Sequence, residues 1–232
     1  MSNYTLIRNV DAGDLAALRD LVRFGVMADD QIARRYADPA SAPLRLAQLK
    51  DDGVISIWWE PLEGARLYSP TRLAQIVVGL RKLRLRTVYR SHLAHDVAVV
   101  DLADWLLAQG PQLEFVTEAE VHDYLERIAP APARLPGDTR HRPDGLLISA
   151  GERVAIELEH SDKSYARYTS ISGWFVKEWR VDRVRWFVDN PKVLDRLAHV
   201  NSVHGFDRDM KIDIEPFPPG VRLRQMRGRY ES

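Results

Sequence analysis

The stretch His141-Arg-Pro-Asp-Gly-Leu-Leu-Ile-Ser-Ala-Gly-Glu-Arg-Val-Ala-Ile-Glu-Leu-Glu-His-Ser-Asp-Lys163 decides how the rest of the chain is interpreted. An apolar run, a glycine-containing turn and a second, alternating run predict a β-hairpin. Residues of a strand alternate between the two faces of a sheet, so Glu157 and Glu159 share one face, roughly 6 to 7 Å apart. Asp144, on the paired strand, can face the same side.

Carboxylates crowded at a strand end repel one another, and each raises the pKa of the next unless a cation lies between them. One interpretation is therefore a divalent metal site held by Asp144, Glu157 and Glu159. The other is that the acids lie on the solvated face of an edge strand, with Lys163 as a surface counter-charge, since alternating charge is common on half-buried strands. Spacing alone leaves both interpretations open.

The composition sets the broad class of the protein. The chain has 232 residues, 45% of them apolar, which is enough to bury a substantial core in one large or two small domains. No apolar run approaches the roughly 18 residues of a membrane helix, and the N-terminus lacks a signal pattern, so we expect a soluble, cytoplasmic protein with no membrane partner. Cysteine is absent, so any metal ion has to bind oxygen or imidazole ligands.

A net charge of zero conceals an uneven distribution of charge. Residues 1–90 hold 14 Lys/Arg and 10 Asp/Glu, residues 91–216 hold 15 and 22, and residues 217–232 hold four and one. One basic run, defined here as Arg81, Lys82, Arg84 and Arg86, is especially dense. A basic front, an acidic middle and a basic tail suit a chain that contacts nucleic acid at its ends, although ordinary solvated faces produce similar counts.

The start of the chain predicts three short helices and a two-stranded ribbon. Helices are expected over 11–24, 28–36 and 41–52, each with apolar residues at helical spacing. The ribbon follows at 54–59 and 66–68. This order is typical of a winged helix, a helix-turn-helix variant whose usual partner is double-stranded DNA. A module that docks onto protein is the alternative.

Several polar residues of this region are candidates for DNA contact. Ser41, Arg45 and Gln48 recur at helical spacing on the outer side of the third helix, where residues that read the major groove belong. Arg66, in the wing, is expected to rest on phosphates. A further helix, expected over 73–85, carries the basic run on its exposed side and extends the DNA-binding surface.

The remainder of the chain alternates helices and strands. From residue 91 the order is helix, strand, helix, hairpin, helix, strand, helix and strand, which predicts a mixed α/β sandwich. Thr117 and Glu120 form a capping box for a helix over 118–128. The predicted organisation is a winged-helix domain (1–72), a basic helical linker (73–90), an α/β domain (91–216) and a basic tail (217–232).

The order of elements and the hairpin motifs carry two nested resemblances. A helix, a hairpin with Pro143-Asp144 on one strand and acid-x-acid on the next, and then a helix and a strand resemble the PD-(D/E)xK nuclease superfamily. The winged helix followed by Arg142-Pro-Asp-Gly-Leu-Leu and Val154-Ala-Ile-Glu-Leu-Glu-His-Ser-Asp-Lys-Ser164, with His95-Asp96 after the linker, is similar to the actinobacterial replication-relaxation family. That resemblance implies a DNA-binding protein of a plasmid or integrative mobile element, acting in replication, DNA relaxation or transcriptional control.

The nuclease resemblance implies a second function, that of a metal-dependent DNA endonuclease or nickase. It makes Asp144 and Glu157 ligands of Mg²⁺ or Mn²⁺, with Glu159 as a third carboxylate. The superfamily normally has lysine where this chain has Glu159, and a carboxylate cannot replace a cation beside a phosphate. Lys163, four residues further on, has the reach to return to the site.

Histidines complete the set of catalytic candidates. His95 is a candidate ligand or base, although a lone histidine on a helix is more often a packing residue. The same packing role is expected of His141 and His160. On the binding-only interpretation no cofactor is needed, and the α/β domain is a nuclease-like scaffold for ligand sensing or dimerisation, with a homodimer as one option.

Overall fold

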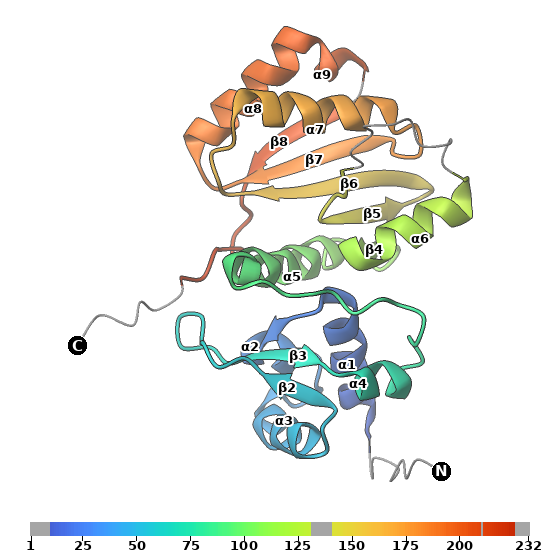
Figure 1. The fold of residues 1–232 in the computed structure, drawn as a ribbon, viewed down its shortest axis with the longest axis vertical. Helices are drawn as coiled ribbons and strands as arrows, with labels where there is room; N and C mark the ends of the chain where they lie inside the picture. The colour runs from blue at the N-terminus through green and yellow to red at the C-terminus, as the bar shows by residue number, and fades with distance from the viewer. Residues whose placement is uncertain (1–9, 131–140, 210, 226–232) are drawn as a thin grey trace, which may run out of the picture. The chain divides into compact units, whose positions relative to one another are not determined.

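The computed structural model describes residues 10–130, 141–209 and 211–225, so the tail beyond residue 225 lies outside the described residues. The described chain has a mixed α/β fold with two sheets, as predicted, and it divides into two compact units (Figure 1). The first unit comprises residues up to Val100 together with 223–225, and the second comprises Asp101–Arg222. The division falls within helix α5 (Leu93–Leu107), later than the expected domain start at residue 91. None of the helices in the described ranges combines the length and the apolar character needed to cross a membrane.

The first unit contains the three predicted helices and a small sheet. The helices are α1 (Ala12–Phe24), α2 (Asp29–Ala33) and α3 (Ala42–Asp51). The predicted ribbon is present as β2 (Ile55–Ile57) and β3 (Leu67–Pro70), and an unpredicted strand, β1 (Met27–Ala28), pairs with the free side of β3. All pairings in this sheet are antiparallel, and the sheet order is β1-β3-β2.

Two helices of the first unit are shorter than predicted. The helix expected to reach Tyr36 ends at Ala33, because the chain turns so that the Tyr36 hydroxyl donates a hydrogen bond to Asp14 Oδ1 over 2.8 Å. The helix expected over 73–85 is wrong beyond Val77: α4 spans Arg72–Val77. Gly79 takes a left-handed φ of 74°, and the basic run lies in turns and extended chain.

Asp14 connects three segments of the first unit. Its carboxylate is completely buried and accepts hydrogen bonds from the backbone N–H of Asp11, from the Tyr36 hydroxyl and from the Arg45 guanidinium, with Nε at 3.2 Å. Asp11 in turn caps α1 by accepting from the N–H of Asp14 over 2.8 Å. This one side chain therefore links the start of α1 to α3 and to the segment after α2.

The second unit is built on a five-stranded sheet of order β4-β5-β6-β7-β8. The strands β4, β5 and β6 pair antiparallel, and β7 and β8 continue the sheet in parallel with β6. Their bounds are Glu114–Thr117, Gly145–Ser149, Glu152–Glu159, Arg183–Val188 and Lys211–Pro216. The helices are α6 (Glu118–Ile128), α7 (Tyr165–Lys177), α8 (Pro191–His204) and the unpredicted α9 (Phe206–Asp209), together with the second half of α5.

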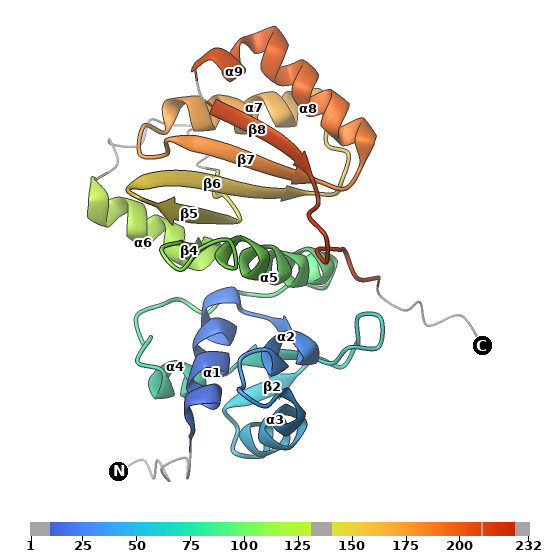
Figure 2. The same ribbon diagram turned by 180° about the vertical axis from the view of Figure 1, so that it is seen from behind.

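The predicted hairpin is β5 with β6, joined by a turn in which Ala150 and Gly151 both have positive φ. One face of the sheet packs against α6, α7 and α8 in a single apolar cluster that includes Tyr168, Phe175 and Trp186; α7 is seen behind the sheet in Figure 2. Phe187, on the other face, contacts Trp105 of α5 with ring centroids 6.2 Å apart. The sheet is therefore covered on both sides.

We expect Asp14→Ala to lower the free energy of unfolding of the first unit by about 2 to 4 kcal/mol, because the Arg45 guanidinium and the Tyr36 hydroxyl lose their shared acceptor. Burial raises the pKa of Asp14, but the hydrogen bonds from Arg45, Asp11 and Tyr36 outweigh it and hold the pKa below 3.8. A lowered carboxyl pKa stabilises the fold above the unfolded pKa, and this stability is lost as the pH falls through the folded pKa. Urea unfolding followed by circular dichroism at pH 7 and below pH 4 measures both effects.

The control for this variant is Asp51→Ala, which removes an exposed ion pair with Lys50 at 3.6 Å. Exposed pairs contribute at most about 1 kcal/mol, so Asp51→Ala should change stability little. Equal losses in the two variants would contradict a special role for Asp14.

Candidate functional site

The acids of the hairpin lie on neighbouring strands at one end of the second sheet. Glu157 pairs in register with Trp186 and Glu159 with Val188, and both partners belong to the apolar cluster under α7 and α8. Asp144 immediately precedes β5, and its Oδ2 accepts a hydrogen bond of 2.8 Å from the N–H of Leu158. Glu157 and Glu159 therefore share a face, as predicted, and it is the face that the helices cover. The interpretation that they lie on the solvated face of an edge strand is wrong.

Glu157 is paired with a histidine. Glu157 is only 6% exposed, and its Oε1 lies 2.6 Å from Nε2 of His141. The imidazole of His141 packs edge-on against two rings of α7, with centroid distances of 5.4 Å to Phe175 and 5.8 Å to Trp174. The histidine is thus held between β6 and α7.

Burial and neighbouring charge shift the proton affinity of both members of this pair. Burial, opposed by His141 and Lys163 and aided by the Asp144 carboxylate, raises the pKa of Glu157 to about 7. Burial lowers the pKa of His141, but the Glu157 carboxylate outweighs it and the pKa is raised above 6.5. The two groups are in hydrogen-bonding contact, so the protonation of one depends on that of the other. Shifts of this kind are typical of functional sites, although structural ion pairs also produce them.

Glu159 is held by a second set of partners. It is 1% exposed, and its Oε1 accepts from the N–H and the hydroxyl of Ser161 at 3.0 and 2.9 Å. Its Oε2 pairs with the ammonium of Lys163, which returns to the strand from the start of the next helix. The Tyr168 hydroxyl braces this loop, because it accepts from the N–H of Lys163 and donates to the carbonyl of Ser161 at 3.2 and 2.9 Å.

Two residues outside the predicted set complete the surroundings. Asp189 follows β7, and burial, aided by the Glu159 carboxylate and opposed by His160, raises its pKa. Arg196 of α8 donates to the carbonyl of Lys163 over 2.8 Å and pairs with Asp162. Long-range contacts from α8 therefore hold the loop after β6.

The side chains predicted to hold Mg²⁺ or Mn²⁺ are engaged with other partners. Within residues 10–130, 141–209 and 211–225, no three His, Asp or Glu side chains are grouped so that they can hold a metal ion. Oε1 of Glu157 faces His141, and both oxygens of Glu159 are taken by Ser161 and Lys163. The acids share one face, but in this arrangement they do not fit a metal centre.

The residues expected to read DNA have different surroundings. The Arg45 guanidinium is drawn toward Asp14, and its Nη1 donates to Gln48 Oε1 over 2.6 Å. The Ser41 hydroxyl donates to the carbonyl of Asp38 over 2.7 Å. Gln48 is exposed on α3, and its outward face combines polar and apolar side chains, the other exposed residues being Pro43, Leu44, Ala47, Lys50 and Asp51.

The predicted phosphate contacts divide into two groups. Arg66 is exposed in the wing, and Arg81, Lys82 and Arg84 are exposed in the loop after α4 without an ion-pair partner among the described residues. Arg86 instead pairs with the buried Asp96 over 2.9 Å.

His95 lies half-buried on α5, in the part of that helix that belongs to the first unit. The carboxylates lie in the second unit. His141, which the sequence suggested to be a packing residue, is the histidine that contacts an acid of the hairpin. The prediction from sequence missed this role; the signal for it is the place of His141 three residues before Asp144, on the chain that enters β5.

We expect the pH dependence of stability near neutrality to depend on Glu157. Both raised pKa values mean that the folded state holds protons more tightly than the unfolded state. This stability is complete below pH 4.5 for Glu157 and below pH 6.5 for His141, and is lost as the pH rises through about 7 and beyond. Urea unfolding should show wild-type stability falling by roughly 1 to 3 kcal/mol from pH 5 to pH 8, and Glu157→Gln should flatten this fall.

Glu152→Gln, at the opposite end of β6, is the matched control because it removes a carboxylate from the same strand. It should retain the wild-type dependence on pH. A dependence that survives in Glu157→Gln would assign the titration to other groups.

Comparison with known proteins adds no further constraint: no family model, no curated protein and no solved structure matches this chain.

Proposed function

We propose that this chain is a DNA-binding protein and that its first unit acts as a winged helix. The observation that carries the proposal is the exposed loop with Arg81, Lys82 and Arg84, which have no ion-pair partner among the described residues. Unpaired surface cations attract phosphates, and the release of counterions from DNA favours binding. The order α1, β1, α2, α3, β2, β3 also supports a winged helix, with α3 as the element for the major groove.

The distribution of ion pairs explains why this loop is favoured over other basic residues. Arg35 pairs with Asp20 at 2.7 Å, Arg45 with Asp14, and Arg90 with Glu60 at 2.6 Å. An arginine that already neutralises an acid adds little to the attraction for phosphate. The cations of the loop and Arg66 in the wing are therefore the strongest candidates for DNA contact.

The role in a plasmid or integrative mobile element is the finer part of the proposal. It comes from the resemblance of the hairpin motifs to the actinobacterial replication-relaxation family. Replication control, DNA relaxation or transcriptional control all require a protein that finds a duplex site, so DNA binding is the property to test first.

We expect replacement of Arg81, Lys82 and Arg84 by alanine to weaken binding to duplex DNA and to reduce its salt dependence. Each lost phosphate contact lowers the slope of log K against log salt by about 0.9, so the slope should fall by roughly 2 to 3. Fluorescence anisotropy with labelled duplex DNA at several salt concentrations measures the slope.

The matched control replaces Lys177, Lys192 and Arg208, three exposed cations of the second unit, and changes the net charge equally. Its slope should stay close to that of the wild type. An equal loss in both triple variants would indicate a general effect of net charge. Binding that does not weaken with salt would favour the protein-docking alternative.

A metal-dependent endonuclease or nickase is the second candidate function. The observation that favours it is the gathering of Asp144, Glu157 and Glu159 on one face, with the pKa of Glu157 raised to about 7 chiefly by burial. Metal binding in this site requires Glu157 to leave His141 and Glu159 to leave Lys163, which makes this candidate weaker than DNA binding.

On this second function we expect Mg²⁺ or Mn²⁺ to support cleavage of plasmid DNA, and both Asp144→Ala and Glu157→Ala to abolish it. Glu152→Ala, a carboxylate of the same hairpin outside the cluster, should retain cleavage. Gel assays on supercoiled, linear and single-stranded DNA, with a calorimetric Mn²⁺ titration of each variant, give two independent readouts. The absence of both cleavage and metal binding would leave DNA binding as the function.

A further inference from the structure

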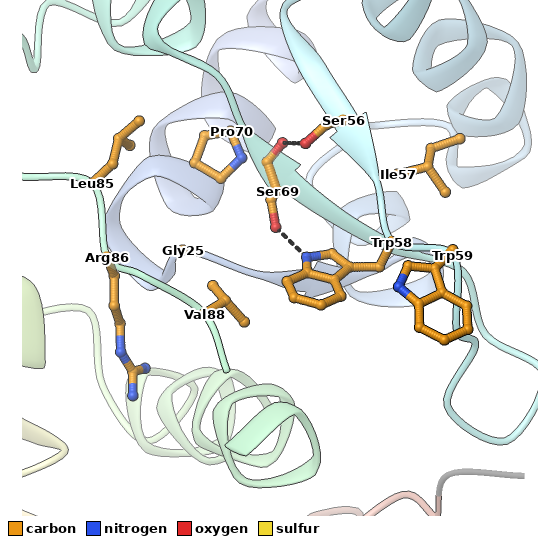
Figure 3. A pocket seen from close by; sticks show the side chains of 10 residues that line it. All are labelled: Gly25, Ser56, Ile57, Trp58, Trp59, Ser69, Pro70, Leu85, Arg86 and Val88. Carbon is orange, nitrogen blue, oxygen red and sulfur yellow. Dashed lines mark hydrogen bonds between the residues drawn. The ribbon is translucent and has the colours of Figure 1, made fainter. Parts of the chain in front are cut away.

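A pocket of about 290 Å³ opens in the first unit between the sheet and the chain at the end of the basic run, residues 85–88 (Figure 3). Trp58 and Trp59 extend along one side of it, and Leu85, Arg86 and Val88 lie opposite. Ser56, Ser69 and Pro70 from β2 and β3 form the end between these two sides. The volume is at the small end of the range for ligand sites in proteins.

The two tryptophans differ in how they are held. Trp58 is half-buried and packs against the core of the first unit, and its Nε1 donates to the Ser69 hydroxyl over 2.6 Å. Trp59 is 64% exposed, although the Arg90 guanidinium lies 6.0 Å from its ring centroid. One ring is thus fixed in orientation, while the other offers a large aromatic surface to solvent.

The charge around the pocket is suited to an anionic ligand. Leu85 and Arg86 of the pocket directly follow Arg84 of the exposed basic loop. The nearby acid Glu60 is neutralised by Arg90, and Asp96 by Arg86. Arg86 and Arg90, beside the pocket, are therefore both paired with acids, and the cations left to attract a phosphate are Arg81, Lys82 and Arg84, which directly precede Leu85 in the chain.

We infer that this pocket binds an unpaired nucleobase of single-stranded DNA, with its ring stacked on Trp59 and its phosphates beside the loop that carries Arg81, Lys82 and Arg84. Exposed indoles beside cations bind single strands because every base has a face that can stack. In a duplex that face is covered by the neighbouring base pairs, so the ligand has to be unpaired. The serine hydroxyls at the end of the pocket can meet the polar edge of a base. This inference rests on the proposed DNA-binding function and adds a preference for partly opened DNA.

The experiment measures the affinity of wild type, Trp59→Ala and Trp59→Phe for a labelled oligothymidylate and for a labelled duplex by fluorescence anisotropy. Trp59→Ala should weaken single-strand binding about 10-fold, as expected for the loss of one stacked base, and leave duplex binding unchanged. Trp59→Phe should recover part of the affinity. An abasic single strand, which keeps the phosphates without the rings, should bind wild type and Trp59→Ala equally.

Trp179→Ala is the matched control, because Trp179 is 60% exposed but belongs to the second unit. It should bind the oligothymidylate like the wild type. Two outcomes would overturn the pocket and leave the proposed function standing. In one, the wild type binds duplex and Trp59→Ala has no effect on single-strand binding; in the other, Trp59→Ala weakens single-strand and duplex binding equally. A wild type that binds neither DNA at low salt would overturn both.

Discussion

The arrangement of the second unit depends on the cost of burying two carboxylates on β6. Glu157 and Glu159 lie on the face of the sheet that packs against α7 and α8, next to Trp186 and Val188. A buried carboxylate without partners is destabilising by several kcal/mol, so the surrounding chain has to supply cations and donors. His141 does so for one acid, and Ser161 with Lys163 for the other. The entry to β5 and the loop after β6 are therefore fixed by the charges that they compensate.

The cations that compensate these acids occupy the positions in which a metal ion would bind them. A protonated His141 and Lys163 together bring two positive charges to the acids, the same charge that one divalent cation supplies. The acids are neutralised by cations of the same chain. Despite these cations, burial raises the pKa of Glu157 to about 7. A metal would compete with internal partners that are already in hydrogen-bonding distance. The charge of these acids is thus compensated from within the chain.

Sequence patterns predicted the helices, strands and turns that neighbouring residues determine. They failed for features that depend on residues far apart in the sequence. The capping box of Thr117 and Glu120 and the turn at Ala150-Gly151 are set by neighbours in sequence, and both are present. The prediction of a helix beyond Val77 was wrong. Gly79 and the hydrogen bond from the Gln75 side chain to the carbonyl of Leu83 turn a run with good helix propensity into a loop. The partners of Arg45 and Glu157 lie 31 and 16 residues away, a separation at which no periodicity identifies them.

The rule that shapes the acid cluster also determines which cations of the first unit remain available. Asp14, Asp96 and Glu60 are all buried, and each is paired with an arginine: Arg45, Arg86 and Arg90 respectively. A buried carboxylate without a partner is strongly destabilising, so each of these acids is paired with an arginine. An exposed cation is solvated by water and needs no such partner. Charge counting along the sequence treats all these arginines alike, but burial of the acids divides them into structural and available groups. The available group, Arg81, Lys82 and Arg84, directly precedes Leu85 and Arg86, which line the pocket opposite Trp58 and Trp59.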